Sequence, residues 1–340
     1  MKPAALRDAA LWLLTFGVVT ASDPLALAQS APATEAPAQQ QRGENPKPAA
    51  APFQWQADPQ GVSLVQDGGL VLRYEFRSGS KPIVYPLNGP GGVSMTRDYP
   101  MKPAEQGDSK DHIHQRSLWM THGEVNGIDF WMEGEKAGRI EHDKVISSDV
   151  DQGKAKLVTT ANWLTPDDQW LLRESRAMTV SGDEAMRQVE FSIDLTAGDN
   201  PVHFGDTKEG SFGVRVPDSM TVDKKTGGSI LNEHGERDGA AWGKRSRWVD
   251  YSGPVGDQTV GITILEHPKS HGHPCRWHVR TYGLFAANPF GEHHFTGGKA
   301  TEGFTLAPGK TLHLQYKLLL HSGAPDTEAI EAAWKQFAGQ

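Results

Sequence analysis

Residues 189–195 read VEFSIDL, and residues 312–320 read LHLQYKLLL. Large apolar side chains occupy every second position of the first segment, and the second segment alternates in the same way until its final leucines. Successive side chains of a β-strand point to opposite faces, so each segment is expected to bury one face and expose the other. Shorter runs of the same kind occupy residues 70–76, 212–216 and 260–265.

Turn-forming residues separate these runs. The chain contains 37 glycines and 22 prolines, and clusters of them lie at residues 67–69, 88–92, 181–183 and 307–310. This pattern is typical of antiparallel strands joined by tight turns. We therefore predict an all-β fold, a large two-sheet antiparallel β-sandwich, whose paired sheets leave a concave face or rim for a ligand.

The C-terminal residues alone have a helical pattern. Ile330, Trp334 and Phe337 fall on one face of a helix, and Asp326 or Thr327 can cap its N-terminus. We expect this helix to pack on the outside of a sheet.

The N-terminus has the layout of a secretory signal. Lys2 and Arg7 precede an apolar run at residues 9–19, and small residues at positions 26 and 28 suit signal peptidase. We predict a signal peptide at residues 1–28, a disordered linker rich in alanine, proline and glutamine at residues 29–52, and a single domain at residues 53–340. The protein is then expected in the periplasm or outside the cell.

Charge and cysteine content exclude several classes of protein. The formal net charge of −8 argues against a nucleic-acid surface. Charges interrupt every later apolar run, so we expect no membrane span beyond the signal. The single cysteine, Cys275, cannot form an internal disulfide, and no oriented partner makes it a nucleophile.

The first candidate site lies at residues 108–131. His112 and His114 would share one face of a strand, suited to a metal or to a substrate oxygen, while Asp111 would face away unless the segment is a loop. The same stretch supplies candidate substrate-binding groups, namely Arg116, His122, Asn126, Asp129 and Trp131.

Two further stretches contain candidate catalytic or substrate-binding residues. Glu209 and Lys208 precede a buried strand, where they make either a solvated turn or the rim of an active site with Glu209 as acid or base. On a continuous strand Arg276, His278, Arg280 and Tyr282 would form a cationic stripe that suits sugar hydroxyls or carboxylates. Asn288 follows in the same stretch.

The chain also resembles a family of exported bacterial proteins of unknown function, often labelled "methane oxygenase PmoA". The matching pieces are residues 81–87 (KPIVYPL), 111–119 (DHIHQRSLW), 122–131 (HGEVNGIDFW) and 280–291 (RTYGLFAANPFG). The family segment resembles Asp-His-Pro-His-His-Arg, and here Ile113 and Gln115 replace its proline and last histidine. Methane oxidation is not expected, because the namesake subunit spans a membrane several times. The resemblance instead implies a galactose-mutarotase-like supersandwich, in which a histidine and a carboxylate on the concave sheet perform acid–base work at a sugar.

Our leading hypothesis is therefore an exported carbohydrate-active enzyme of epimerase, hydrolase or lyase type, acting on a sugar or oligosaccharide. His112 or His114 would move a proton at a ring or glycosidic oxygen, Glu209 would be the complementary carboxylate, and Lys208, Arg280 and Asn288 would hold hydroxyls. Trp119, Trp131 and Trp277 would offer this enzyme stacking faces for a sugar. One alternative is a metal-dependent enzyme in which His112, His114 and a third residue bind a divalent metal, although we predict no cofactor. The third ligand would be His122, Asp129 or a residue from 267–278. The other alternative is a non-catalytic carbohydrate-binding module, for which tryptophans such as Trp131 would matter and the histidines would not.

Overall fold

A computed structural model describes residues 52–183 and 185–339 of the chain. The predicted signal peptide and nearly all of the predicted linker lie outside the described residues. The described residues belong to one compact unit. No helix among them has the length and apolar character needed to cross a membrane.

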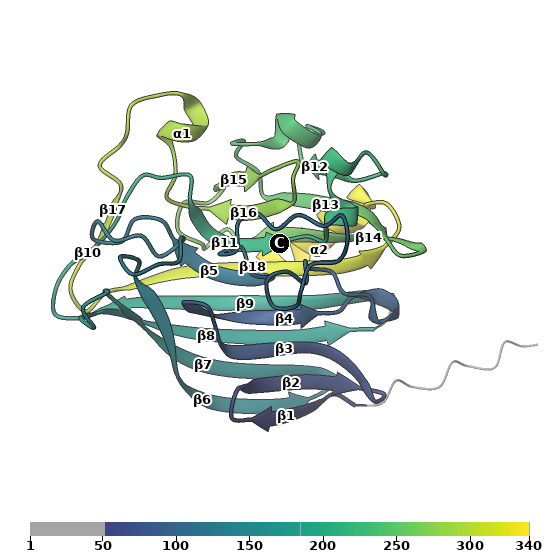
Figure 1. Cartoon of the computed structure of the whole chain (residues 1–340), viewed down its shortest axis with the longest axis horizontal. Coiled ribbons are helices and arrows are strands. Elements are labelled where there is room, and N and C mark those ends of the chain that lie inside the picture. Colours follow the sequence, from purple (N-terminus) through teal and green to yellow (C-terminus); the bar gives the residue numbers. More distant parts are fainter. Residues whose placement is uncertain (1–51, 184, 340) are drawn as a thin grey trace, which may run out of the picture. The chain divides into compact units, whose positions relative to one another are not determined.

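Two eight-stranded antiparallel sheets dominate the described chain (Figure 1). The first sheet has, in spatial order, β1 (Gln54–Asp58), β2 (Gly61–Gln66), β3 (Gly69–Ser78), β4 (Lys81–Leu87), β5 (Leu118–His122), β11 (Gly210–Arg215), β16 (Leu284–Asn288) and β15 (Arg276–Val279). The second has β12 (Ser229–Asn232), β13 (Trp248–Val255), β14 (Gln258–Glu266), β18 (Thr311–Ser322), β9 (Met186–Ala197), β8 (Trp170–Gly182), β7 (Lys154–Leu164) and β6 (Arg139–Asp151).

Short elements complete the fold. Strands β10 (Val202–Phe204) and β17 (Phe304–Leu306) form a two-stranded ribbon. The helical elements are η1 (Pro90–Gly92), η2 (Asp218–Met220), η3 (Val222–Lys224), η4 (Asp238–Ala241), α1 (His293–Thr296) and α2 (Thr327–Ala338). The predicted all-β two-sheet sandwich with a C-terminal helix is confirmed.

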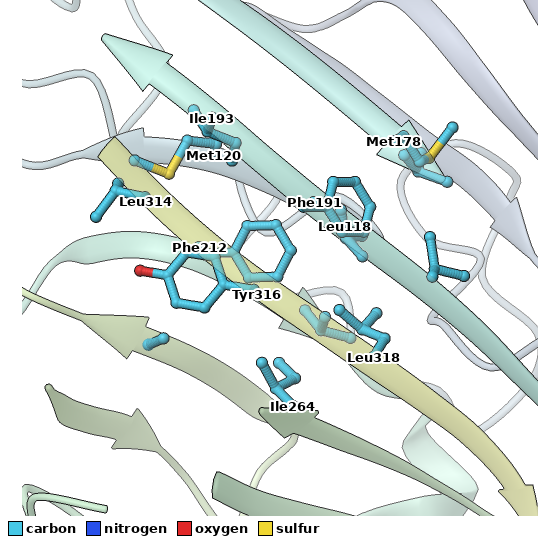
Figure 2. Close-up of a cluster of buried hydrophobic side chains, with 14 of the residues drawn as sticks. Leu118, Met120, Met178, Phe191, Ile193, Phe212, Ile264, Leu314, Tyr316 and Leu318 are labelled. Carbon is cyan, nitrogen blue, oxygen red and sulfur yellow. The ribbon is translucent and has the colours of Figure 1, made fainter. Parts of the chain in front are cut away.

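Aromatic side chains join the two sheets in the main core. Phe212 of β11 stacks on Tyr316 of β18, with ring centroids 4.6 Å apart and planes 10° from parallel, and Phe191 of β9 meets Phe212 edge-on at 5.1 Å (Figure 2). Phe191 lies in the predicted alternation of residues 189–195, whose apolar members are at most 1% exposed. The alternation therefore identified the buried face correctly, and the register of β9 with β18 aligns Phe191 beside Tyr316.

The end of β18 is buried on both faces. Leu319 points away from the main core yet is only 1% exposed, because it packs with Ile330 and Trp334 of α2. The indole nitrogen of Trp334 also donates to the carbonyl oxygen of Glu266 at 2.9 Å. The helix thus explains why alternation ends in a run of leucines.

Removing the cap of α2 is expected to lower stability measurably. The Asp326 carboxylate accepts hydrogen bonds from the backbone N–H groups of Glu328 and Ala329, both at 3.1 Å. Asp326→Ala leaves these donors without that acceptor and should reduce the free energy of unfolding by about 1 kcal/mol, measured by urea titration. Asp326→Asn, which can still cap, should change it far less. Equal stability of the alanine variant and the native protein would contradict this role.

Candidate active site

One face of the first sheet points away from the main core. On β5, Leu118 and Met120 belong to that core, so Trp119 between them points outwards into a separate cluster. Gly213 of β11 pairs with Trp119 and leaves room for its indole, since a Cβ at Gly213 would approach the ring to 2.7 Å. Trp131 packs beside Trp119 with ring centroids 5.3 Å apart. We call this outward face of β5, β11, β16 and β15, with the loops that cover it, the site face.

Residues 108–117 form a loop over the site face. The predicted strand, with His112 and His114 on one side, is therefore wrong. His112 has a φ of 44°, which lies in the left-handed region and outside strand geometry. The loop conformation brings Asp111 and His112 together instead of pointing them to opposite sides.

Asp111 is the centre of this loop. Its carboxylate accepts from Arg97 Nη1 at 2.8 Å and Arg215 Nη2 at 2.9 Å, and its other oxygen lies 2.6 Å from Nδ1 of His112. Partial burial alone would raise the pKa of Asp111, but the charge of Arg215 and the hydrogen bonds that it receives hold that pKa well below its ordinary value. Asp111 therefore stays ionised and orients the imidazole of His112.

His112 is the accessible histidine of the site face. Its ring is stacked on that of Tyr282, with centroids 5.1 Å apart and planes within 5° of parallel, and its side chain is 40% exposed. Because Nδ1 faces Asp111, the opposite nitrogen, Nε2, is the atom that can meet a ligand. An exposed imidazole oriented by a carboxylate is a common arrangement for proton transfer.

His114 lies deeper, with its ring centroid 5.6 Å from that of His112 and 6.3 Å from that of Trp131. It is 4% exposed. Burial lowers the pKa of His114 to about 4, and the nearby positive charge of Lys81 acts in the same direction. His114 is therefore neutral at pH 7 and is better suited to holding a hydroxyl group than to delivering a proton.

Glu209 and Lys208 directly precede β11, and Lys208 lies next to His278 of β15. Their side chains form an ion pair, and each is about one-third exposed. Nδ1 of His278 donates to the carbonyl oxygen of Lys208 at 2.8 Å, which leaves Nε2 of that ring as an acceptor. Burial lowers the pKa of His278 to about 4, opposed by the negative charge of Glu209, so His278 is also neutral at pH 7.

The three predicted stretches converge. Gln115 donates to the hydroxyl of Tyr282 at 3.4 Å, and Asn288 donates to the carbonyl oxygen of Thr207 at 2.9 Å. The charge of Glu209 acts on the pKa values of the histidines in both other stretches. One surface therefore combines an exposed imidazole, a carboxylate and two neutral imidazoles.

The predicted cationic stripe is interrupted. Strand β15 ends at Val279, and residues 280–283 form the turn to β16. Arg276 is engaged elsewhere, with Nη2 and Nε at 2.5 and 2.8 Å from the Glu292 carboxylate. Arg280 begins the turn and lies over the rings of Trp242 and Tyr282.

Several predicted binding residues have other partners. His122 is fully buried, with Nε2 at 2.8 Å from the carbonyl oxygen of Gly205 and Nδ1 at 3.2 Å from the Ser211 hydroxyl. The Asn126 side chain accepts from His203 N at 2.7 Å. The Asp129 carboxylate accepts from the N–H groups of residues 131 and 132. These side chains organise turns and the sheet edge.

The tryptophans do not offer stacking platforms. Trp119, Trp131 and Trp277 are at most 1% exposed. Their apolar area is already used inside the protein, so the prediction that these three residues offer stacking faces for a sugar is wrong.

Within residues 52–183 and 185–339, no group of three or more histidine, cysteine, aspartate or glutamate side chains is placed to hold a metal ion. Both ring nitrogens of His122 are within hydrogen-bond distance of protein groups. This side chain therefore does not form a common site with His112 and His114. His112 and His114 are thus not joined by a third predicted ligand among these residues.

Sequence reasoning missed a buried ion pair beneath the site face. Lys81 is fully buried, and its Nζ lies 3.1 Å from Oε1 of Glu133, which also pairs with Nε of Arg116 at 2.8 Å. Arg116 is therefore committed to Glu133. Lys81 lies in a segment whose alternation is too weak to reveal a charged core position, and nothing in the local sequence indicates its partner.

Gln115 and Arg215 were also missed. The guanidinium of Arg215 donates to the Gln115 side chain at 2.6 Å, and both residues are at most 1% exposed. An arginine in the otherwise apolar run at residues 212–216 was the available clue. Gln115 occupies the place of the last histidine in the resembling family segment, and here it links Arg215 to Tyr282 below the surface.

One hollow of the described residues lies away from the site face. It has a volume of about 410 Å³ and is lined by Phe76, Arg77, Arg139, His142 and their neighbours, none of them an acid–base residue of the site face. On the site face, the side chains of His112, Lys208 and Glu209 are all at least partly exposed.

Fold and site define a two-sheet β-sandwich protein with a polar, histidine-containing face on one sheet. The profile of DUF6807, described as a family of unknown function, matches residues 61–335, and the chain belongs to that family. This description assigns no activity and does not carry the PmoA label. No curated protein matches the chain.

Solved structures with related folds bear names from carbohydrate chemistry. A polysaccharide lyase is 12% identical over 84% of this chain, with a TM-score of 0.35, and this chain spans 34% of its length. A galactose mutarotase-like protein from Clostridium acetobutylicum is 10% identical over 79% of this chain and 95% of its own, with a TM-score of 0.36. Another, from Lactobacillus casei, is 11% identical over 79% and 100%, with a TM-score of 0.31. Likenesses this distant leave the function to be argued from the side chains.

Proposed function

We propose that this protein is an exported enzyme that acts on a sugar or oligosaccharide by acid–base catalysis at the site face. His112 delivers a proton to a ring or glycosidic oxygen, and Glu209 accepts one from a hydroxyl group or carbon of the substrate. The observation that carries the proposal is the Asp111–His112 pair, 2.6 Å apart, on the same surface as the Glu209 carboxylate.

The environment of each group supports its role. Asp111 is held ionised by two guanidinium groups, and its second oxygen binds Nδ1 of His112, which leaves Nε2 to meet the substrate oxygen. The Glu209 carboxylate is paired with the Lys208 side chain and is the group that accepts a proton in this scheme.

The buried histidines support substrate binding. His114 and His278 are neutral at pH 7 because burial lowers both pKa values to about 4. A neutral imidazole offers one donor and one acceptor, which suits the hydroxyl groups of a sugar. The structure favours His112 over His114 for proton transfer, since His112 is exposed and has a carboxylate partner.

The proposal is tested with pools of neutral and acidic oligosaccharides, followed by NMR for new reducing ends, unsaturated products or altered stereochemistry. The native protein is expected to convert at least one pool. Glu209→Gln, which keeps the shape of the side chain but cannot take a proton, should lower kcat by about 100-fold. Undiminished turnover by the folded Glu209→Gln variant would remove Glu209 from the mechanism.

A further inference from the structure

Arg280 is a partly buried cation at the site face, and it has no carboxylate partner among the described residues. Its guanidinium carbon lies 5.9 Å from the ring centre of Trp242 and 5.6 Å from that of Tyr282. Four other cationic side chains near the site face are paired with acids, in the pairs Lys208–Glu209, Arg215–Asp111, Arg116–Glu133 and Arg276–Glu292.

The backbone holds Arg280 in place. Its N–H donates to the carbonyl oxygen of Leu284 at 2.7 Å, and its own carbonyl oxygen accepts from Gly283 at 3.0 Å and from the Tyr251 hydroxyl at 3.3 Å. Two aromatic rings then support the guanidinium. A supported guanidinium keeps the donors along its edge available, and loses less side-chain freedom when it binds an anion.

Arg280 shares the ring of Tyr282 with the proton-transfer group. The same ring stacks on His112 at 5.1 Å between centroids. The positive charge of Arg280 also contributes to the low pKa of His278. A ligand that meets His112 and Glu209 therefore lies within reach of Arg280.

We infer that the ligand of the site face is an acidic sugar, a uronide whose carboxylate pairs with Arg280. This inference rests on the proposed function and names its class of substrate. The fork of a guanidinium matches the two oxygens of a carboxylate, and a half-buried site weakens screening of that pair by solvent. The neutral His114 and His278 would serve the hydroxyl groups of the same sugar.

Binding measurements with matched ligands distinguish the effect of the ligand's charge from the effect of its shape. The probes are trisaccharides of galacturonate and of glucuronate, each as the free acid and as the methyl ester, with galactose 6-sulfate as an anion of different geometry. Isothermal titration calorimetry with the full protein should give a Kd for one free acid at least about tenfold lower than for its ester. The preference should shrink at high salt.

Variants assign the preference to one side chain. Arg280→Gln should remove the discrimination between acid and ester, and Arg280→Lys should restore only part of it, because lysine keeps the charge without the fork. Arg276→Gln is the matched control, an arginine four positions earlier that is already paired with Glu292, and it should leave the preference intact. Equal binding of acid and ester by the native protein, tighter binding of the sulfate than of either uronide, or a preference that survives Arg280→Gln would each overturn the inference.

The two proposals fail in different ways. Uronide binding that depends on Arg280, without turnover in any pool, would contradict the proposed enzymatic activity and support the inferred class of ligand. Turnover of a neutral sugar that depends on His112, with no preference for the acid, would support the proposed activity and contradict the inferred class of ligand.

Discussion

His112→Ala is expected to lower kcat/KM about 10²–10⁴-fold on whichever oligosaccharide the native protein converts. The variant removes the exposed imidazole, while Asp111 keeps its bonds to Arg97 and Arg215. The loop should therefore stay folded, and urea unfolding of the variant should resemble that of the native protein. The rate constants come from initial rates across a range of substrate concentrations.

Controls distinguish proton transfer from simple damage. Added imidazole should recover part of the turnover of His112→Ala, because the deleted ring leaves space beside Asp111, and it should not rescue Glu209→Gln. His114→Asn should act mainly on KM, since a neutral hydroxyl-binding group is lost. A folded His112→Ala protein with native kcat/KM would refute the assignment of His112.

Glu133→Gln is expected to destabilise the protein by about 3–5 kcal/mol, the usual cost of leaving a buried charge without its partner. Lys81 is fully buried, and Glu133 is the carboxylate that pairs with it and with Arg116. Glutamine keeps the size of the side chain but loses the negative charge. Urea titration measures the effect as a shift in midpoint at constant slope.

The double variant Lys81→Met/Glu133→Gln isolates the charge. Removing the lysine as well should recover much of the lost stability, because no buried cation then remains. A Glu133→Gln protein within 1 kcal/mol of the native one, on this order-of-magnitude scale, would show that Lys81 does not depend on Glu133.

The pH dependence of stability provides a second control for Lys81. Burial lowers the pKa of Lys81 from 10.5 to about 8 in the folded protein. Between these values the unfolded chain binds a proton that the folded protein does not, so this residue makes stability rise with pH in that window. Lys81→Met should remove that contribution, seen as a flatter pH profile than that of the native protein.

Much of the fold was predictable because the alternation of apolar and polar residues along a strand indicates which of its faces is buried. Residues 189–195 and 312–320 became the buried centre of the second sheet, and the pattern of Ile330, Trp334 and Phe337 identified α2. The sequence also indicated the candidate stretches around His112, Glu209 and His278, because titratable side chains that gather within a few residues are visible in a sequence.

Only the tertiary structure decided how those groups face one another. Asp111 was expected to point away from His112, and instead it receives Arg97 and Arg215 from distant segments and binds His112 directly. The Lys81–Glu133 pair joins residues 52 positions apart, and no local pattern encodes such a pair. Local periodicity determined which side chains are buried and which faces they share. Long-range contacts, set by the pairing of β5 with β11 and of β15 with β16, determined which charges meet.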